Sequence, residues 1–138
     1  MSLFIDTAVI MYAGGGDHPL REPCGLIIER VGAGELDAVT STEVVQEIVH
    51  RFIAIRRPDI AGSMAKRTMD TFTPVIPMTH ALMRRIPDLI DRYPTLSARD
   101  LVHVATCIHE GIVEIVSPDR GFDVVKELRR VPPEDFVS

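Results

Sequence analysis

Short apolar segments alternate with longer amphipathic segments along this chain. Four short segments separated by turn residues fit β-strands: residues 2–5, 37–40, 73–77 and 112–116. The first and the last are mostly apolar, as strands of a parallel sheet are when both faces are covered. The segment 73–77 is flanked by prolines, which predicts a short strand near an edge of the sheet. A further short strand at 130–131 would give a sheet of four to five strands.

Apolar residues recur with helical spacing between these strands. We expect helices at residues 7–13, 19–31, 42–57, 60–72, 79–93, 98–110 and 121–128. Pro19 fits the first turn of its helix, and Pro58 ends the helix that precedes it. Pro87 predicts a kink or a break, and Gly111 predicts a helix C-cap.

Strands separated by helical crossovers imply a parallel sheet with helices on both faces. We therefore predict an α/β fold with three layers, α/β/α, formed by residues 1–138 as one domain. In such sheets the functional crevice lies at the carboxyl ends of the strands. Asp6 and Asp119 each follow a predicted strand, so both should lie at that edge.

The composition indicates a folded protein with a buried core and argues against a membrane protein. The chain of 138 residues is 46% hydrophobic, which indicates a buried core. No apolar run approaches the roughly 18 residues that a membrane helix needs, and the first residues lack the basic region of a signal peptide. Cys24 and Cys107 lie in apolar helical patterns, so we expect buried, reduced thiols and a cytoplasmic protein.

Charge is distributed unevenly along the chain. The net charge is -5, which argues against a simple basic nucleic-acid binder. Residues 50–99, however, hold nine Lys or Arg against four Asp, whereas the remaining residues carry a net charge of -10. A basic middle between acidic ends suits an enzyme that binds a polyanion beside an acidic metal site, although each arginine also fits a solvated helix face.

Four acidic residues follow or accompany apolar runs that would fix them in a packed core: Asp6, Glu47, Asp100 and Asp119. If the fold gathers them, their mutual repulsion requires a cation, and carboxylates without a Cys or His set favour Mg²⁺ or Mn²⁺. Each also has a local explanation, since Asp6 fits a helix N-cap, Asp100 a capping box with Ser97, and Asp119 a turn. Asp123, one helical turn after Asp119, is an additional candidate ligand.

Glu43 is the rival of Glu47 for the second acidic position. Glu43 is explained by a capping box with Thr40, whereas Glu47 lies one turn later among apolar residues and needs a partner or a metal. His103, three residues after Asp100, fits a packed helix histidine that flanks the same site.

Motifs in four places resemble the PIN-domain family, in particular the VapC-type toxin ribonucleases of toxin–antitoxin pairs. They are Phe4-Ile5-Asp6-Thr7, the segment Ser41–Ile48 with Glu47, Asp100-Leu101-Val102-His103-Val104-Ala105, and Ser117-Pro118-Asp119-Arg120-Gly121-Phe122. The resemblance covers essentially the whole chain.

This resemblance implies a Mg²⁺- or Mn²⁺-dependent endoribonuclease. Asp6, Asp100 and Asp119 would bind the metal, and Glu47 would bind a metal or orient its water. Thr7 or Ser117 would bond to a carboxylate or a water. Basic residues of the middle region would hold the RNA backbone, Arg51, Arg56 and Arg57 among them.

The resemblance also implies a VapB-like antitoxin, with an arginine that docks in the acidic pocket, and a homodimer. The alternative is a catalytically silent PIN-like module that binds RNA or a protein.

Overall fold

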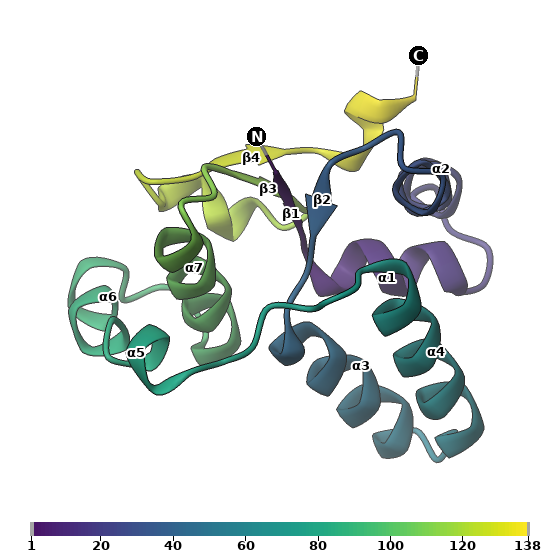
Figure 1. Ribbon diagram of the computed structural model, residues 1–138, viewed down its shortest axis with the longest axis horizontal. Coiled ribbons are helices and arrows are strands. Elements are labelled where there is room, and N and C mark those ends of the chain that lie inside the picture. Colours follow the sequence, from purple (N-terminus) through teal and green to yellow (C-terminus); the bar gives the residue numbers. More distant parts are fainter. Residues whose placement is uncertain (1, 138) are drawn as a thin grey trace.

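The computed structural model describes residues 2–137 and contains one parallel β-sheet. Its strands are β1 (Leu3–Ile5), β2 (Ala38–Val39), β3 (Glu114–Val116) and β4 (Arg129–Val131), in the order β2-β1-β3-β4. The register pairs Phe4 with Val39 on one side and with Ile115 on the other. The two central strands, β1 and β3, therefore end side by side at the edge of the sheet where the sequence predicted Asp6 and Asp119 (Figure 1).

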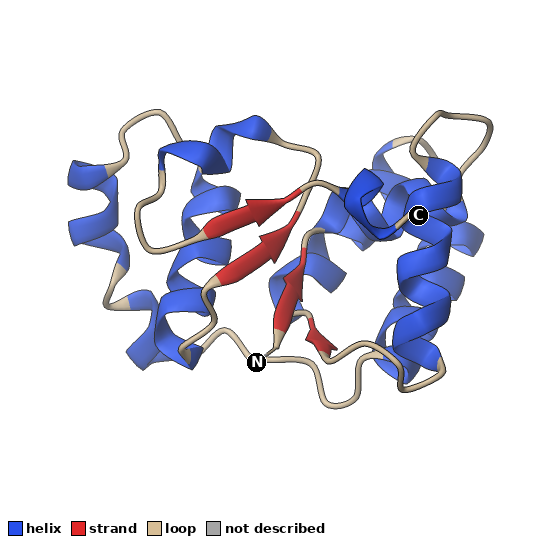
Figure 2. Ribbon diagram, turned by 90° about the horizontal axis from the view of Figure 1, so that it is seen from above, coloured by secondary structure: helices blue, strands red, loops and turns tan. Residues whose placement is uncertain are grey.

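Helices cover both sides of the sheet, which confirms the predicted α/β/α layers (Figure 2). They are α1 (Thr7–Gly14), α2 (Arg21–Gly32), α3 (Thr42–Ala54), α4 (Pro58–Thr71), α5 (His80–Met83), α6 (Ile86–Arg92) and α7 (Ala98–Glu110), with 3-10 turns η1 (Arg120–Val124) and η2 (Pro133–Phe136). In Figure 1, α5–α7 lie to the left of the strands and α1–α4 to the right and below. Helices α3 and α7 nevertheless contact each other. No helix within residues 2–137 is long and apolar enough to cross a membrane.

Several predicted elements begin, end or fold differently. Helix α2 begins at Arg21 rather than at Pro19, and the predicted helix 42–57 ends at Ala54, since Arg56 adopts a left-handed φ of 61°. Pro58 therefore opens α4 rather than only ending the helix before it.

Two predicted elements are largely replaced. The predicted strand 73–77 reduces to a single parallel bridge between Ile76 and Ser41, because its prolines have no N–H to donate. The predicted helix 121–128 is the short turn η1 followed by extended backbone at Val125. The helix 79–93 is broken into α5 and α6 near Pro87, and Gly111 caps α7 with a φ of 70°, as expected.

The core is built around the central strands. Phe4, Ile5, Ile115 and Val116 are fully buried. Both cysteines are free and buried, as predicted. This packing fixes the ends of β1 and β3, from which two of the predicted acidic residues project.

Candidate active site

Asp6 lies where β1 passes into α1, and it is almost completely buried at 6% exposure. Its Oδ1 accepts a hydrogen bond from the Thr7 backbone N–H at 2.8 Å, so it does cap α1. Its Oδ2 accepts a hydrogen bond from the Ser117 hydroxyl at 2.6 Å. The Asp6 carboxylate is thereby fixed between two neighbouring strands, at the carboxyl end of the sheet.

Ser117 and Asp119 come from the loop that follows β3. The buried Ser117 hydroxyl also accepts a hydrogen bond from the Asp119 backbone N–H at 3.0 Å. The Asp119 carboxylate accepts one from the Gly121 N–H at 2.8 Å, which gives it the predicted turn role as well. A Cβ atom at Gly121 would lie 3.0 Å from Asp119 Oδ1, so glycine is what lets this carboxylate fold back onto the turn.

Glu47 and Glu43 project from α3 toward the same place. The predicted capping box of Thr40 with Glu43 is wrong: Ser41 caps α3 through a bond from the Val44 N–H, while the Thr40 hydroxyl donates to the Ile5 carbonyl of β1. A capping box therefore does not explain the presence of Glu43 at this position. Burial raises its pKa, with the charge of Glu47 acting in the same direction.

Helix α7 contributes Asp100 in its first turn and His103 one turn later. Ser97 caps α7 by accepting from the Asp100 N–H at 3.2 Å, half of the predicted capping box. His103 is fully buried, and its Nε2 lies 2.7 Å from Glu47 Oε1 and 3.7 Å from Asp6 Oδ1. Packing explains its burial, as predicted, but these contacts with two acids carry no signal in the sequence.

The four predicted residues are linked by their charges: Glu47 acts on Asp6, and Asp6 and Asp119 act on Asp100. Burial raises the pKa of Asp100, and the charges of Asp6 and Asp119 raise it further. Burial also raises the pKa of Asp6, although His103 and Ser117 oppose the shift. We call Asp6, Glu47, Asp100 and Asp119 the carboxylate cluster.

Histidine is the main balancing partner of this cluster. Burial alone would raise the pKa of Glu47, but the hydrogen bond and charge of His103 lower it overall. Conversely, burial would lower the pKa of His103, and the bond to Glu47 with the charge of Asp6 raises it overall. Across residues 2–137, no Lys or Arg forms an ion pair with any member of the cluster.

The donor set fits a hard divalent cation, since it consists of carboxylate oxygens. The Thr7 hydroxyl, Oγ1, is buried without a hydrogen-bond partner of normal geometry in residues 2–137, although it lies near enough to Glu47 to lower the pKa of that carboxyl. In the described part of the chain, no three such side chains already converge as a metal-binding group. Asp6, Glu47 and Asp119 each direct an oxygen at a protein donor.

The other predicted residues lie farther out. Asp123 pairs with Arg130 at 2.8 Å rather than joining the cluster. Arg51 is exposed on α3 one turn after Glu47, whereas Arg56 and Arg57 lie beyond the end of that helix, and Arg57 pairs with Asp59. Sequence reasoning did not single out Arg99, an exposed residue whose charge acts on both Glu43 and Glu47.

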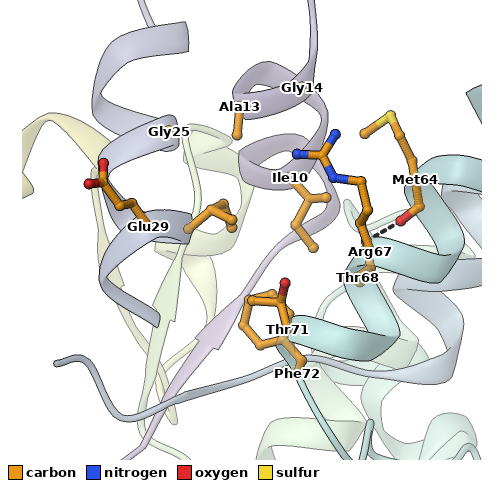
Figure 3. A pocket seen from close by; sticks show the side chains of 11 residues that line it. Ile10, Ala13, Gly14, Gly25, Glu29, Met64, Arg67, Thr68, Thr71 and Phe72 are labelled. Atoms are coloured by element: carbon orange, nitrogen blue, oxygen red, sulfur yellow. Dashed lines mark hydrogen bonds between the residues drawn. The ribbon is translucent and has the colours of Figure 1, made fainter. Parts of the chain in front are cut away.

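A separate cavity of about 270 Å³ lies between α1, α2 and α4 (Figure 3). Its lining is mostly apolar, with Ile10, Met64 and Phe72, and with Glu29 and Arg67 as its charged residues. Residues of the second half of α1 line this cavity, whereas Asp6 caps the start of that helix. We call it the α1–α2–α4 groove; none of the cluster carboxylates lines it.

Comparison with known proteins gives consistent results. The family model described as PIN domain matches residues 3–128. Ribonuclease VapC13 of Mycobacterium tuberculosis is 33% identical over 129 residues, 94% of this chain and 98% of the relative. Ribonuclease VapC23 of the same organism is 35% identical over 117 residues, 85% of this chain and 92% of the relative.

Solved structures agree with the fold. VapBC2 from Rickettsia felis, bound to a DNA fragment from the promoter, superposes with a TM-score of 0.75 over 96% of this chain and 98% of that chain, at 15% identity. A toxin–antitoxin complex from Klebsiella pneumoniae gives a TM-score of 0.69 over 95% and 97%, at 16% identity. The family match and the coverage of the relatives both show that this chain belongs to the PIN-domain family.

Proposed function

We propose that this protein is a metal-dependent endoribonuclease, the toxin of a VapBC-type toxin–antitoxin system, and that residues 1–138 form its single nuclease domain. The observation that carries the proposal is the carboxylate cluster: four acids, from the end of β1, α3, α7 and the loop after β3, gather at one end of the sheet without a Lys or Arg ion pair among residues 2–137. The relatives that cover nearly the whole chain are named ribonucleases. The buried thiols fit action in the cytoplasm.

Asp6, Asp100 and Asp119 would hold Mg²⁺ or Mn²⁺, which lowers the pKa of a water and offsets charge on the phosphate during hydrolysis. Glu47 projects from α3, contacts His103 and would orient the attacking water. Thr7 and Ser117 act on Asp6, through the backbone N–H and the hydroxyl respectively, and hold its carboxylate in place. Asp123 has a different role, because its pairing with Arg130 holds the η1 turn.

RNA would approach along the exposed side of α3. Arg51 lies one turn beyond Glu47, and Arg99 adjoins Asp100, so both are placed to contact phosphates that flank the cleaved bond. Arg56 and Arg57 would bind the RNA backbone farther from the cluster. Substituting Arg51 with Ala should weaken RNA binding and reduce its salt dependence.

Cleavage of a labelled RNA by purified, nuclease-free protein tests the activity directly. We expect cleavage with Mg²⁺ or Mn²⁺, none with EDTA, and products that carry a 5′-phosphate. Asp100→Asn should abolish cleavage while the circular dichroism spectrum stays unchanged. Full activity of that variant would overturn the assignment, and binding of RNA without cleavage by the wild type would favour a catalytically silent module.

We also propose an antitoxin partner, because the structural neighbours are described as toxin–antitoxin complexes. A partner arginine inserted among the cluster carboxylates would take the place of a metal cation. Coexpression with its VapB-like antitoxin should yield a stable complex without RNase activity. Retained activity of such a complex would contradict this docking mode.

A homodimer is the remaining part of the proposal. It would join the basic residues of two α3 helices into one RNA-binding surface. Light scattering at micromolar concentration should give twice the mass of the chain, and a monomer mass would exclude it.

A further inference from the structure

His103 contacts two of the acids of the carboxylate cluster at once. Its Nε2 lies 2.7 Å from Glu47 Oε1 and 3.7 Å from Asp6 Oδ1. These three residues come from α7, α3 and the end of β1, so the imidazole links three separate elements at the point where the cluster forms. Asp100 lies one turn earlier on the same helix and also interacts electrostatically with His103.

The surroundings of the ring fix its orientation. His103 has no exposed surface, and its ring packs on Phe4 of β1 with centroids 5.6 Å apart. Its other nitrogen, Nδ1, is buried without any hydrogen-bond partner in the described residues. A histidine that served only to satisfy polar groups of the core would be expected to use both nitrogens. Here one nitrogen is left unsatisfied while the other is aimed at the acids.

We propose that His103 is a positioning residue: by binding Glu47 and approaching Asp6, it fixes the separation and the rotamers of these carboxylates, so that the cluster is preorganised for a divalent cation. The inference rests on the proposed function and deepens it. Ligand-orienting partners of this kind typically alter metal affinity or activity by about 10- to 100-fold when they are removed. Without His103, Glu47 would be free to rotate toward solvent, since its side chain is already 15% exposed.

Two substitutions separate positioning from packing. His103→Leu fills the core but removes the bond to Glu47. His103→Gln places an amide N–H as many bonds from Cβ as Nε2, so it can still donate to Glu47. Val104→Ala is the matched control, because Val104 is the adjacent, fully buried residue of α7 and touches the core rather than the cluster.

Mn²⁺ binding without RNA, measured by calorimetry or electron paramagnetic resonance, is the first readout. We expect His103→Leu to weaken Mn²⁺ binding by about 10-fold or more and to lower kcat at saturating Mn²⁺ with little change in KM for RNA. His103→Gln should restore most of both. Val104→Ala should lower Tm without changing Mn²⁺ affinity. Wild-type Mn²⁺ affinity in His103→Leu, or a His103→Gln variant as defective as His103→Leu, would overturn the inference.

A measurement without metal tests the positioning role of His103 independently of the proposed nuclease activity. The ¹⁵N chemical shifts of the His103 imidazole should change in Glu47→Gln, because the bond to a carboxylate is lost, and should not change in the exposed-pair control Asp59→Asn. Unchanged shifts in Glu47→Gln would refute the contact itself. A wild type that shows the contact and binds Mn²⁺ but cuts no RNA would refute the proposed nuclease while leaving the positioning role supported.

Discussion

Acidic residues gather in two regions of this molecule, and the two regions differ in the charged partners of their carboxylates. In and just before β4 and its neighbouring elements, three acids each pair with an arginine: Glu127 with Arg92, Glu114 with Arg129, and Asp123 with Arg130. We call this region the β4 edge. In the carboxylate cluster, Asp6 and Asp100 pair with no arginine of residues 2–137, and Asp6 is almost completely buried.

The pKa values follow this difference. Burial would raise the pKa of Glu127, but its bonds from Tyr93 and Arg92 lower it overall, and the bond from Arg130 lowers that of Asp123. Burial raises the pKa of Asp6 and Asp100. The carboxylates of the β4 edge are therefore stabilised by ion pairs within the fold, whereas burial disfavours the charged form of Asp6 and Asp100, which an external cation would stabilise.

Neutralising one acid in each region gives the largest expected contrast. Asp6→Asn should reduce RNA cleavage by about 10³-fold, because a metal ligand contributes several kcal/mol to the transition state. Its Tm should stay the same or rise, since the amide still caps α1 and the cost of burying a charge is gone. Asp123→Asn should change cleavage by no more than about twofold. Cleavage rates and thermal melts of both variants test this, and equal losses of activity would erase the distinction.

Divalent cations should stabilise the protein through the cluster alone. At Mn²⁺ concentrations about 100 times Kd, binding to the folded state adds about 2.7 kcal/mol to the free energy of unfolding, and EDTA removes it. Asp6→Asn should lose most of this gain, whereas Glu127→Gln should keep it. Thermal melts with and without Mn²⁺ measure the effect. A gain that survives in Asp6→Asn would place the cation elsewhere.

Acid should weaken the β4 edge in a narrow pH range. Because the pKa of Glu127 is lowered in the fold, its ion pair stabilises the protein above its ordinary pKa of 4.5 and loses this effect as the pH falls through the folded value. Glu127→Gln should thus destabilise the protein at pH 7 by about 1 kcal/mol, a modest figure since solvent screens the half-buried pair. The difference from wild type should vanish below that range. Urea melts in steps from pH 7 into the acid range test it, and a difference that does not shrink as the pH falls would contradict the electrostatic origin.

Local patterns in the sequence predicted the parts of the site that depend on one element each. Apolar strands followed by Asp6 and Asp119, and the capped helix with Asp100, are local features, and parallel topology brings them to one edge. The prediction of the helix cap failed where a residue distant in the sequence competes for the capping hydroxyl. Thr40 and Ser41 are equivalent caps in the sequence, but the Thr40 hydroxyl is taken by the Ile5 carbonyl of a neighbouring strand.

The contact between His103 and Glu47 could not be predicted from the sequence for the same reason. Its partner Glu47 lies 56 residues away on another helix, and a histidine among apolar residues of α7 has the pattern of ordinary core packing. The segment 121–128 likewise has helical composition, yet Arg130 of β4 binds Asp123 and the Ser117 carbonyl, which fixes η1 as a short turn. Long-range polar contacts decided each of these cases.

A change in the α1–α2–α4 groove should affect neither acidic region, and it has the smallest expected effect. Gly25 lies inside α2 and borders the groove, and an added Cβ atom would meet no heavy atom within 4 Å. Gly25→Ala should therefore stabilise the protein by about 0.5–1 kcal/mol, because alanine loses less backbone entropy in a helix. Cleavage rate and Mn²⁺ affinity should equal those of the wild type. A higher Tm with reduced Mn²⁺ affinity would mean that the groove and the carboxylate cluster are coupled through α1, and that the two ends of this helix are not independent.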